Sequence, residues 1–101
     1  MALATSTLLY RGAAATSSAT LYTVPSSTTT VVTEIMIANT VSAAGTYTIT
    51  LDGTNIATTV AVGGNDTVVI PCKQVLGATK TITGFASATT INFSISGVQI
   101  A

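Results

Sequence analysis

Apolar and hydroxyl side chains alternate residue by residue along much of this chain, and no stretch repeats its apolar residues at the three- and four-residue spacing of a helix. In the clearest example, segment 46–51, Tyr47, Ile49 and Leu51 share one face of an extended strand and three threonines share the other. Thr, Val and Ile supply 41 of the 101 residues, and β-branched residues favour strands. The sequence therefore predicts an all-β protein.

Turn-forming residues divide the chain into short strands. Asp52-Gly53 fits a hairpin turn. Pro25 and Pro71 each end a strand, because proline lacks the backbone N–H that a ladder needs. The strands expected on this basis are 20–24, 29–39, 46–51, 56–62, 67–70, 80–86 and 91–100, with an eighth near Leu8. This spacing is typical of a single-domain antiparallel β-sandwich of seven or eight strands, in either jelly-roll or immunoglobulin-like order.

The longest internal strand, 29–39, carries apolar residues on both of its faces. One face contains Val31, Ile35 and Ile37, and the other contains Val32, Glu34 and Met36. An acidic side chain between apolar ones indicates a surface that is only partly hydrated, in a subunit contact or at a sheet margin.

The last strand changes the parity of its apolar residues. Ile91, Phe93 and Ile95 share one face, whereas Val98 and Ile100 have the opposite parity. A one-residue shift of this kind is what a β-bulge produces. We expect the bulge at Gly97, where the absence of a Cβ tolerates an irregular backbone.

Charge and reactive side chains are scarce: 6% of the residues are charged, three basic and three acidic, with no His and one Cys. Three cations cannot form the basic surface that nucleic-acid binding requires. Without His, the chain cannot assemble a Cys/His or Ser/His pair, and one Cys cannot build a zinc site. No apolar run approaches the ~20 residues of a membrane-spanning helix. We predict no enzymatic activity, catalytic residue, metal or cofactor, no nucleic-acid or membrane partner, and a buried structural role for Cys72.

The low charge also bears on assembly. An ordinary domain has about 25% charged residues, which keep neighbouring molecules apart. Here Thr and Ser must hydrate the outward positions, and they supply hydration without repulsion. Because obligate interfaces are depleted in charged residues, we predict that much of this surface is covered in a permanent assembly.

The first 19 residues differ from the rest. Segment 13–18 has no pattern and no bulky residue, so we divide the chain into an N-terminal arm with a flexible connection, 1–19, and a β-sandwich domain, 20–101. The candidate partner contacts are Leu8, Leu9, Tyr10 and Arg11. The arm is either an edge strand of its own sheet or a segment that reaches a neighbouring subunit, where the Arg11 guanidinium can bind a carboxylate. The N-terminus has no basic segment, so we expect synthesis in the cytoplasm.

Four segments resemble small structural proteins of tailed bacteriophages. They are Leu-Tyr-Thr-Val-Pro at 21–25, the long strand ending in Asn-Thr at 29–40, Asn-Asp-Thr at 65–67 and Ser-Gly-Val-Gln-Ile at 96–100. Gln99 stands where such proteins usually have an acid. The resemblance covers about residues 20 to 100.

The resemblance implies a virion component, most concretely a capsid decoration (cement) protein on the exterior of the shell, made in the host cytoplasm. Such proteins are often β-rich trimers that bind the major capsid protein and stabilise the mature shell by bridging capsomers. A neck, tail or fibre component is the alternative within the same class.

A glycan-recognising sandwich is the alternative from another class. Carbohydrate sites usually use exposed aromatic rings for stacking. By parity, Tyr47, Phe85 and Phe93 point inward, which leaves Tyr10 and Tyr22. The sequence therefore favours the structural function.

Overall fold

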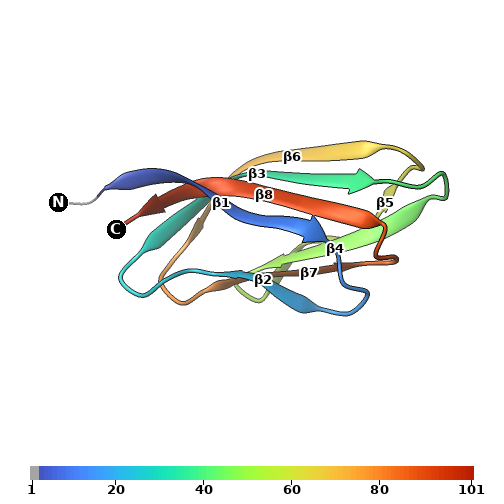
Figure 1. Ribbon diagram of the computed structural model, residues 1–101. Helices are drawn as coiled ribbons and strands as arrows, with labels where there is room; N and C mark the ends of the chain where they lie inside the picture. Colours follow the sequence, from blue (N-terminus) through green and yellow to red (C-terminus); the bar gives the residue numbers. More distant parts are fainter. Residues whose placement is uncertain (1–2) are drawn as a thin grey trace.

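The computed structural model describes residues 3–101, and every regular element in that range is a β-strand (Figure 1). The strands are β1 (Ala4–Ala13), β2 (Ala19–Thr23), β3 (Thr29–Asn39), β4 (Gly45–Leu51), β5 (Thr54–Val62), β6 (Thr67–Leu76), β7 (Thr81–Ala86) and β8 (Ile91–Ile100). The described part of the chain contains no helix long and apolar enough to cross a membrane.

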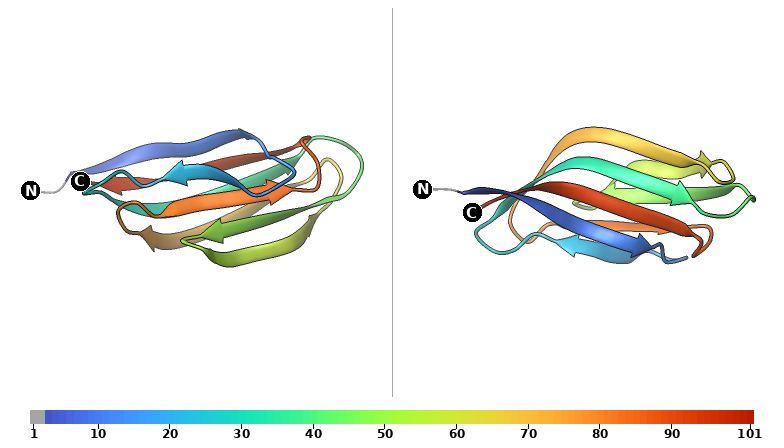
Figure 2. Two further views of the ribbon diagram at one scale, coloured as in Figure 1. Left: turned by 90° about the horizontal axis from the view of Figure 1, so that it is seen from below. Right: turned by 45° about the horizontal axis from the view of Figure 1, so that its top comes forward.

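The strands form two antiparallel four-stranded sheets. Sheet A has the order β1-β8-β3-β6 and sheet B the order β2-β7-β4-β5, and the two sheets lie face to face (Figure 2). The predicted single-domain β-sandwich is therefore confirmed, with eight strands. The pairs β1/β8, β2/β7, β3/β6 and β4/β5 are nested inside one another. Such nesting is that of a jelly roll, one of the two orders that the sequence left open.

The core lies between the sheets and consists of the inward side chains of both. Its largest fully buried members are Phe93, Ile35, Ile37, Ile49, Ile82, Ile91 and Ile95. The inward parity predicted for 46–51 and 91–95 is confirmed, since Tyr47, Ile49 and Leu51 are buried as well. The inward placement of Phe85 was wrong: its neighbours Gly84 and Ala86 are buried, and Phe85 lies half-buried on the outer side of β7.

The expected bulge at Gly97 is also wrong, because the extra residues lie in the strands on either side of β8. Leu9 is the extra residue in β1, and Thr33 is the extra residue in β3. The bulge at Thr33 changes the facing of the residues before it, so Val32 is fully buried and Val31 faces outward. Alternation in β8 continues without interruption: Gly97 is buried, whereas Val98 and Ile100 are partly exposed.

The first strand belongs to the sandwich. β1 is an edge strand of sheet A and pairs with β8 along its whole length. The sequence left two possibilities for the N-terminal segment, and the structure shows the first of them: the segment is an edge strand of its own sheet. The division at residue 19 therefore differs from the structure, in which the sandwich already includes residues 4–13. The start of β1 and the end of β8 lie at the same end of the molecule (Figure 1), where Leu3, the first described residue, and Ala101 exchange backbone hydrogen bonds.

The turn between β6 and β7 contains a conformation that its residue disfavours. Thr79 is exposed and has a φ of 69°, in the left-handed region that costs a β-branched residue about 1–2 kcal/mol and that asparagine tolerates better. We expect Thr79→Asn to raise the free energy of unfolding by about 0.5–1 kcal/mol in urea denaturation. Thr89→Asn, at an exposed turn residue outside the positive-φ set, is the control. An equal gain in both variants would refute the explanation by strain.

Candidate interaction surface

The outward face of sheet A carries exposed apolar side chains on β1, β3 and β6, and β8 adds the half-buried Val98. Its most exposed large apolar residues are Leu8 (50% exposed), Met36 (36%), Val69 (46%) and Val75 (67%). These are four of the eight large hydrophobic residues exposed in the described chain. We call this surface the outer face of sheet A. Exposed apolar residues that gather on one face are a feature of interaction sites.

Strand register explains why these residues gather on one side. Ile35 pairs with Ile95, and both are fully buried. Because successive side chains alternate across a strand, the neighbouring pairs point outward. The resulting outward rows across β8, β3 and β6 are Ser94-Met36-Val69, Ser96-Glu34-Pro71 and Val98-Val31-Val75. β1 adds Arg11 beside Ser94 and Leu8 beside Ser96.

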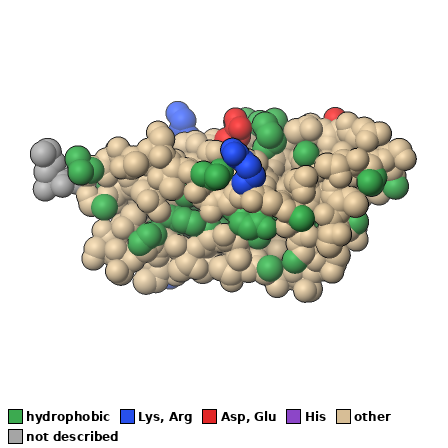
Figure 3. Space-filling model, viewed as in Figure 1, with side chains coloured by type: hydrophobic (Ala, Val, Ile, Leu, Met, Phe, Trp, Pro, Cys, Tyr) green, Lys and Arg blue, Asp and Glu red, His purple; other side chains and the backbone are tan. Residues whose placement is uncertain are grey.

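Charge on the outer face of sheet A is confined to three side chains. Arg11, Glu34 and Lys73 are exposed on β1, β3 and β6. The Arg11 Nε donates a hydrogen bond to the Ser94 Oγ at 3.2 Å. Within residues 3–101 the one ion pair lies elsewhere, between Lys80 and Asp52 at 3.7 Å. Figure 3 shows how few charged side chains interrupt the neutral surface on the face in view.

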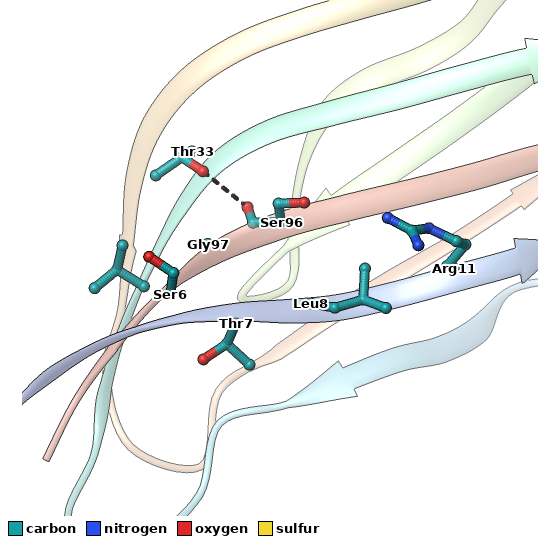
Figure 4. Close-up of a pocket in the computed structure, with 8 residues that line it drawn as sticks. Ser6, Thr7, Leu8, Arg11, Thr33, Ser96 and Gly97 are labelled. Atoms are coloured by element: carbon teal, nitrogen blue, oxygen red, sulfur yellow. Dashed lines mark hydrogen bonds between the residues drawn. The ribbon is translucent and has the colours of Figure 1, made fainter.

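An open hollow of about 500 Å³ lies on this face where the bulges of β1 and β3 flank β8. Its lining residues are Ser6, Thr7, Leu8, Arg11, Thr33, Ser96, Gly97 and Val98 (Figure 4). Thr33 donates a hydrogen bond from its Oγ1 to the Ser96 carbonyl at 3.2 Å. The lining supplies one guanidinium, several hydroxyls and two apolar side chains. It can therefore receive a polar or acidic side chain of a partner.

The structure divides the four predicted contact residues into two pairs. Leu8 and Arg11 are exposed and line the hollow. Leu9 is only 7% exposed and belongs to the core. Tyr10 is half-buried against the core and donates its hydroxyl hydrogen to the Ala13 carbonyl at 2.8 Å. Leu9 is thus unable to contact a partner, because the bulge in β1 turns its side chain inward.

Sequence reasoning missed Val75 because it ended the strand at Pro71, and it assigned no outward face to Val69 within the short apolar run 67–70. In the structure β6 continues through Pro71 to Leu76. It can do so because β6 is an edge strand, where an N–H missing from the open side breaks no ladder bond. The residues Val68 to Cys72 do not alternate in polarity, so the sequence held no signal for this continuation. The alternation of half-buried and exposed residues through 68–73 is visible only in the structure.

Cys72 is half-buried beneath this surface and packs against the core. Its Sγ donates a hydrogen bond to the Val32 carbonyl at 3.4 Å. Burial raises the pKa of the thiol above its usual range, and the Gln74 backbone amide lowers it in part. The described residues contain no group of three His, Cys, Asp or Glu that could hold a metal ion.

The aromatic side chains are not arranged as an exposed platform. Tyr47 and Phe93 are buried, and the other three are half-buried. Burial raises the pKa of Tyr47. The Tyr22 hydroxyl lies 3.0 Å from the Thr30 Oγ1 and accepts a hydrogen bond from the Gln99 Nε2. Gln99, the departure from the acidic pattern, thus satisfies a partly buried polar cluster.

Comparison of the chain with models of known protein families, with curated proteins and with solved structures found no match. The strand order of the two sheets is that of a jelly-roll β-sandwich. The candidate interaction site is the outer face of sheet A.

Proposed function

We propose that this protein is a structural component of a tailed-bacteriophage virion, most concretely a capsid decoration protein. In this proposal it binds the exterior of the mature shell and stabilises that shell by bridging capsomers. Its partners are the major capsid protein and further copies of the chain. The protein binds and does not catalyse.

The observation that carries the proposal is the group of exposed apolar side chains on the outer face of sheet A. Leu8, Met36, Val69 and Val75 are held there at the cost of exposure to water, and exposed apolar side chains that gather on one face are a feature of interaction sites. A protein that binds across capsomer boundaries adds its binding free energy to the stability of the shell. Such a function needs a wide, rigid contact surface and no reactive group.

Two further observations support the same class of function. The segments 21–25, 29–40, 65–67 and 96–100 carry the resemblance to phage structural proteins. Jelly rolls are frequent in viral capsid domains and in lectins. The half-buried or buried state of all five aromatic side chains favours the structural function over glycan recognition.

A co-sedimentation experiment tests the proposal directly. The purified chain is mixed with shells of its parent phage that lack it, either before or after expansion. We expect saturable binding to expanded shells, together with a higher melting temperature of the shell. Equal binding to both kinds of shell, or none to either, would contradict the capsid proposal, and binding to isolated tails would favour a neck or tail component.

Substitutions on the outer face of sheet A test which surface binds. We expect Val69→Glu and Val75→Glu each to weaken shell binding by about tenfold or more, because an unpaired carboxylate would be buried at the contact. Ile56→Glu, at a similarly exposed β-branched residue on edge strand β5 of sheet B, is the matched control. Affinities come from the same sedimentation assay. Weaker binding by the Ile56 variant alone would assign the contact to sheet B.

A further inference from the structure

The four sheet edges of the sandwich differ in how well they can accept another strand. β6 contains Pro71, and its pairing with β3 is irregular. β5 has two register shifts and a residue of positive φ, Thr59. β2 has five residues and one irregularity. Bulges, prolines and short length are the usual protections of an edge strand. β1, by contrast, runs in regular register from Ala4 to Leu8 before its bulge.

The hydrogen-bonding pattern shows which backbone groups of β1 are free. Leu3 and Ala101 exchange both of their backbone hydrogen bonds. In an antiparallel ladder, bonded and non-bonded pairs alternate, and the register is regular from Ala4↔Ile100 to Leu8↔Ser96. The N–H and C=O groups of Ala4, Ser6 and Leu8 therefore point away from β8. We find no hydrogen bond to these groups within residues 3–101.

We propose that β1 pairs with β1 of a second copy of this chain, antiparallel, about a two-fold axis at Ser6. In this register Ser6 faces Ser6 of the second copy, and Ala4 faces Leu8. Each pair exchanges two hydrogen bonds, so every free backbone group of the regular segment is satisfied. The two copies of sheet A then form one continuous sheet.

Side chains at this contact fit one another. Exposed Leu8 lies across from Ala4, a small residue that leaves room for it, and on the opposite face Thr5 lies across from Thr7, a favourable cross-strand pair. The segment 4–8 contains no charge. The two Arg11 residues lie roughly 30 Å apart at the ~3.3 Å rise of a strand, well beyond the ~8–10 Å over which salt screens their repulsion.

Other arrangements satisfy fewer groups. If the two β1 strands are shifted by two residues from this register, some of the free N–H and C=O groups of Ala4, Ser6 and Leu8 lose their partners. If they are shifted by one residue, the free groups of one strand lie across from residues whose own groups point away from them. A ring of three copies joined edge to edge requires β1 to meet a different edge of its neighbour, and each of those edges is interrupted. Pairing of β1 therefore makes closed dimers, in contrast to the trimers that the resemblance implies.

The test compares the molar mass of the full chain with that of two variants at Ser6, by sedimentation equilibrium. Ser6→Pro removes an N–H that bonds nothing within the chain, so we expect it to fold normally. It should raise the dimer dissociation constant by about tenfold or more, since the bonds at the axis are lost. Ser6→Ala keeps the N–H and should remain dimeric. Circular dichroism verifies that each variant is folded.

A crosslinking variant gives a second, independent readout. In a Cys72→Ala background, Ser6→Cys should form a disulfide-linked dimer on mild oxidation, because paired Cα atoms about 5.5 Å apart lie within disulfide reach. Ala13→Cys, an exposed residue at the far end of β1, should not form one. A monomeric or trimeric wild-type chain, a Ser6→Pro variant as dimeric as wild type, or equal crosslinking at both positions would each overturn the proposal. Shell binding plays no part in these measurements, so they can fail while the proposed virion function holds.

Discussion

Replacement of Gly97 by alanine is expected to lower the free energy of unfolding by about 3 kcal/mol or more. A Cβ at this position would overlap the Val31 carbonyl oxygen and lie 2.9 Å from the Leu9 Cδ1. The Val31 backbone is held in the β3 ladder next to the Thr33 bulge, and Leu9 is itself the bulged residue of β1. The Val31 backbone cannot move without disturbing the pairing of β3, and the Leu9 side chain would have to repack in the core. Chemical denaturation monitored by circular dichroism measures the loss.

Gly77→Ala is the matched control for this prediction. A Cβ there meets nothing within 4 Å, and Gly77 is outside the positive-φ set. We expect its stability to stay within about 0.5 kcal/mol of wild type, or to rise slightly because alanine restricts the unfolded chain. Similar losses in the two variants would mean that chain flexibility, and not space beside Val31, makes Gly97 necessary.

Replacement of Asn39 by aspartate is expected to cost about 3 kcal/mol at neutral pH. Asn39 is 4% exposed. Its Nδ2 donates to the carbonyls of Ala43 and Gly63, at 2.7 and 3.2 Å, and its Oδ1 accepts from the Val41 N–H at 3.3 Å. A carboxylate keeps the acceptor, loses both donors and places negative charge against two carbonyl oxygens. The turn after β3 would then lose its attachment to the end of β5.

The pH dependence of the Asn39→Asp variant provides an additional check. Burial against two carbonyls should raise the pKa of the new carboxyl in the folded state above its unfolded value. The stability of the variant should therefore be greatest below the unfolded pKa of about 4 and fall as pH rises through the folded pKa. Asn92→Asp, at an exposed residue of β8, should change stability by at most about 0.5 kcal/mol. Equal losses in the two variants would contradict the bridging function of Asn39.

The strands were predictable because alternation is a local property. Tyr47, Ile49 and Leu51 are two residues apart and must share a face once the backbone is extended. The bulges at Leu9 and Thr33 were not predictable in this way. An extra residue is defined by what lies opposite it on another strand. The parity change at Gly97 was the signal of a bulge in the sequence, but Gly97 lies between the two bulged strands and is not itself a bulged residue.

The candidate site was predictable in part for the same reason. Leu8 and Arg11, which the sequence predicts as partner contacts, are exposed on the outer face of sheet A, as are Glu34 and Met36, which the sequence places together on one face. Val31 and Val32 lie on the faces opposite to those predicted, because the bulge at Thr33 separates them from Glu34. Val75 was missed because the tolerance of a strand for Pro71 depends on whether that strand lies at a sheet edge. Val69 was missed because the consecutive apolar residues Val68, Val69 and Ile70 do not show which of them faces outward.

By itself, the sequence determined the β class, the approximate strand positions and the shortage of charge, since each follows from neighbouring residues or from composition. Only the tertiary structure decided the jelly-roll order, the side of each sheet that faces water and the inclusion of β1 in sheet A. These depend on pairing between segments far apart in the chain, such as Ala4 with Ile100. Alternation of apolar and polar residues specifies that a strand has an apolar face. Pairing between distant segments decides which strands are its neighbours in the sheet.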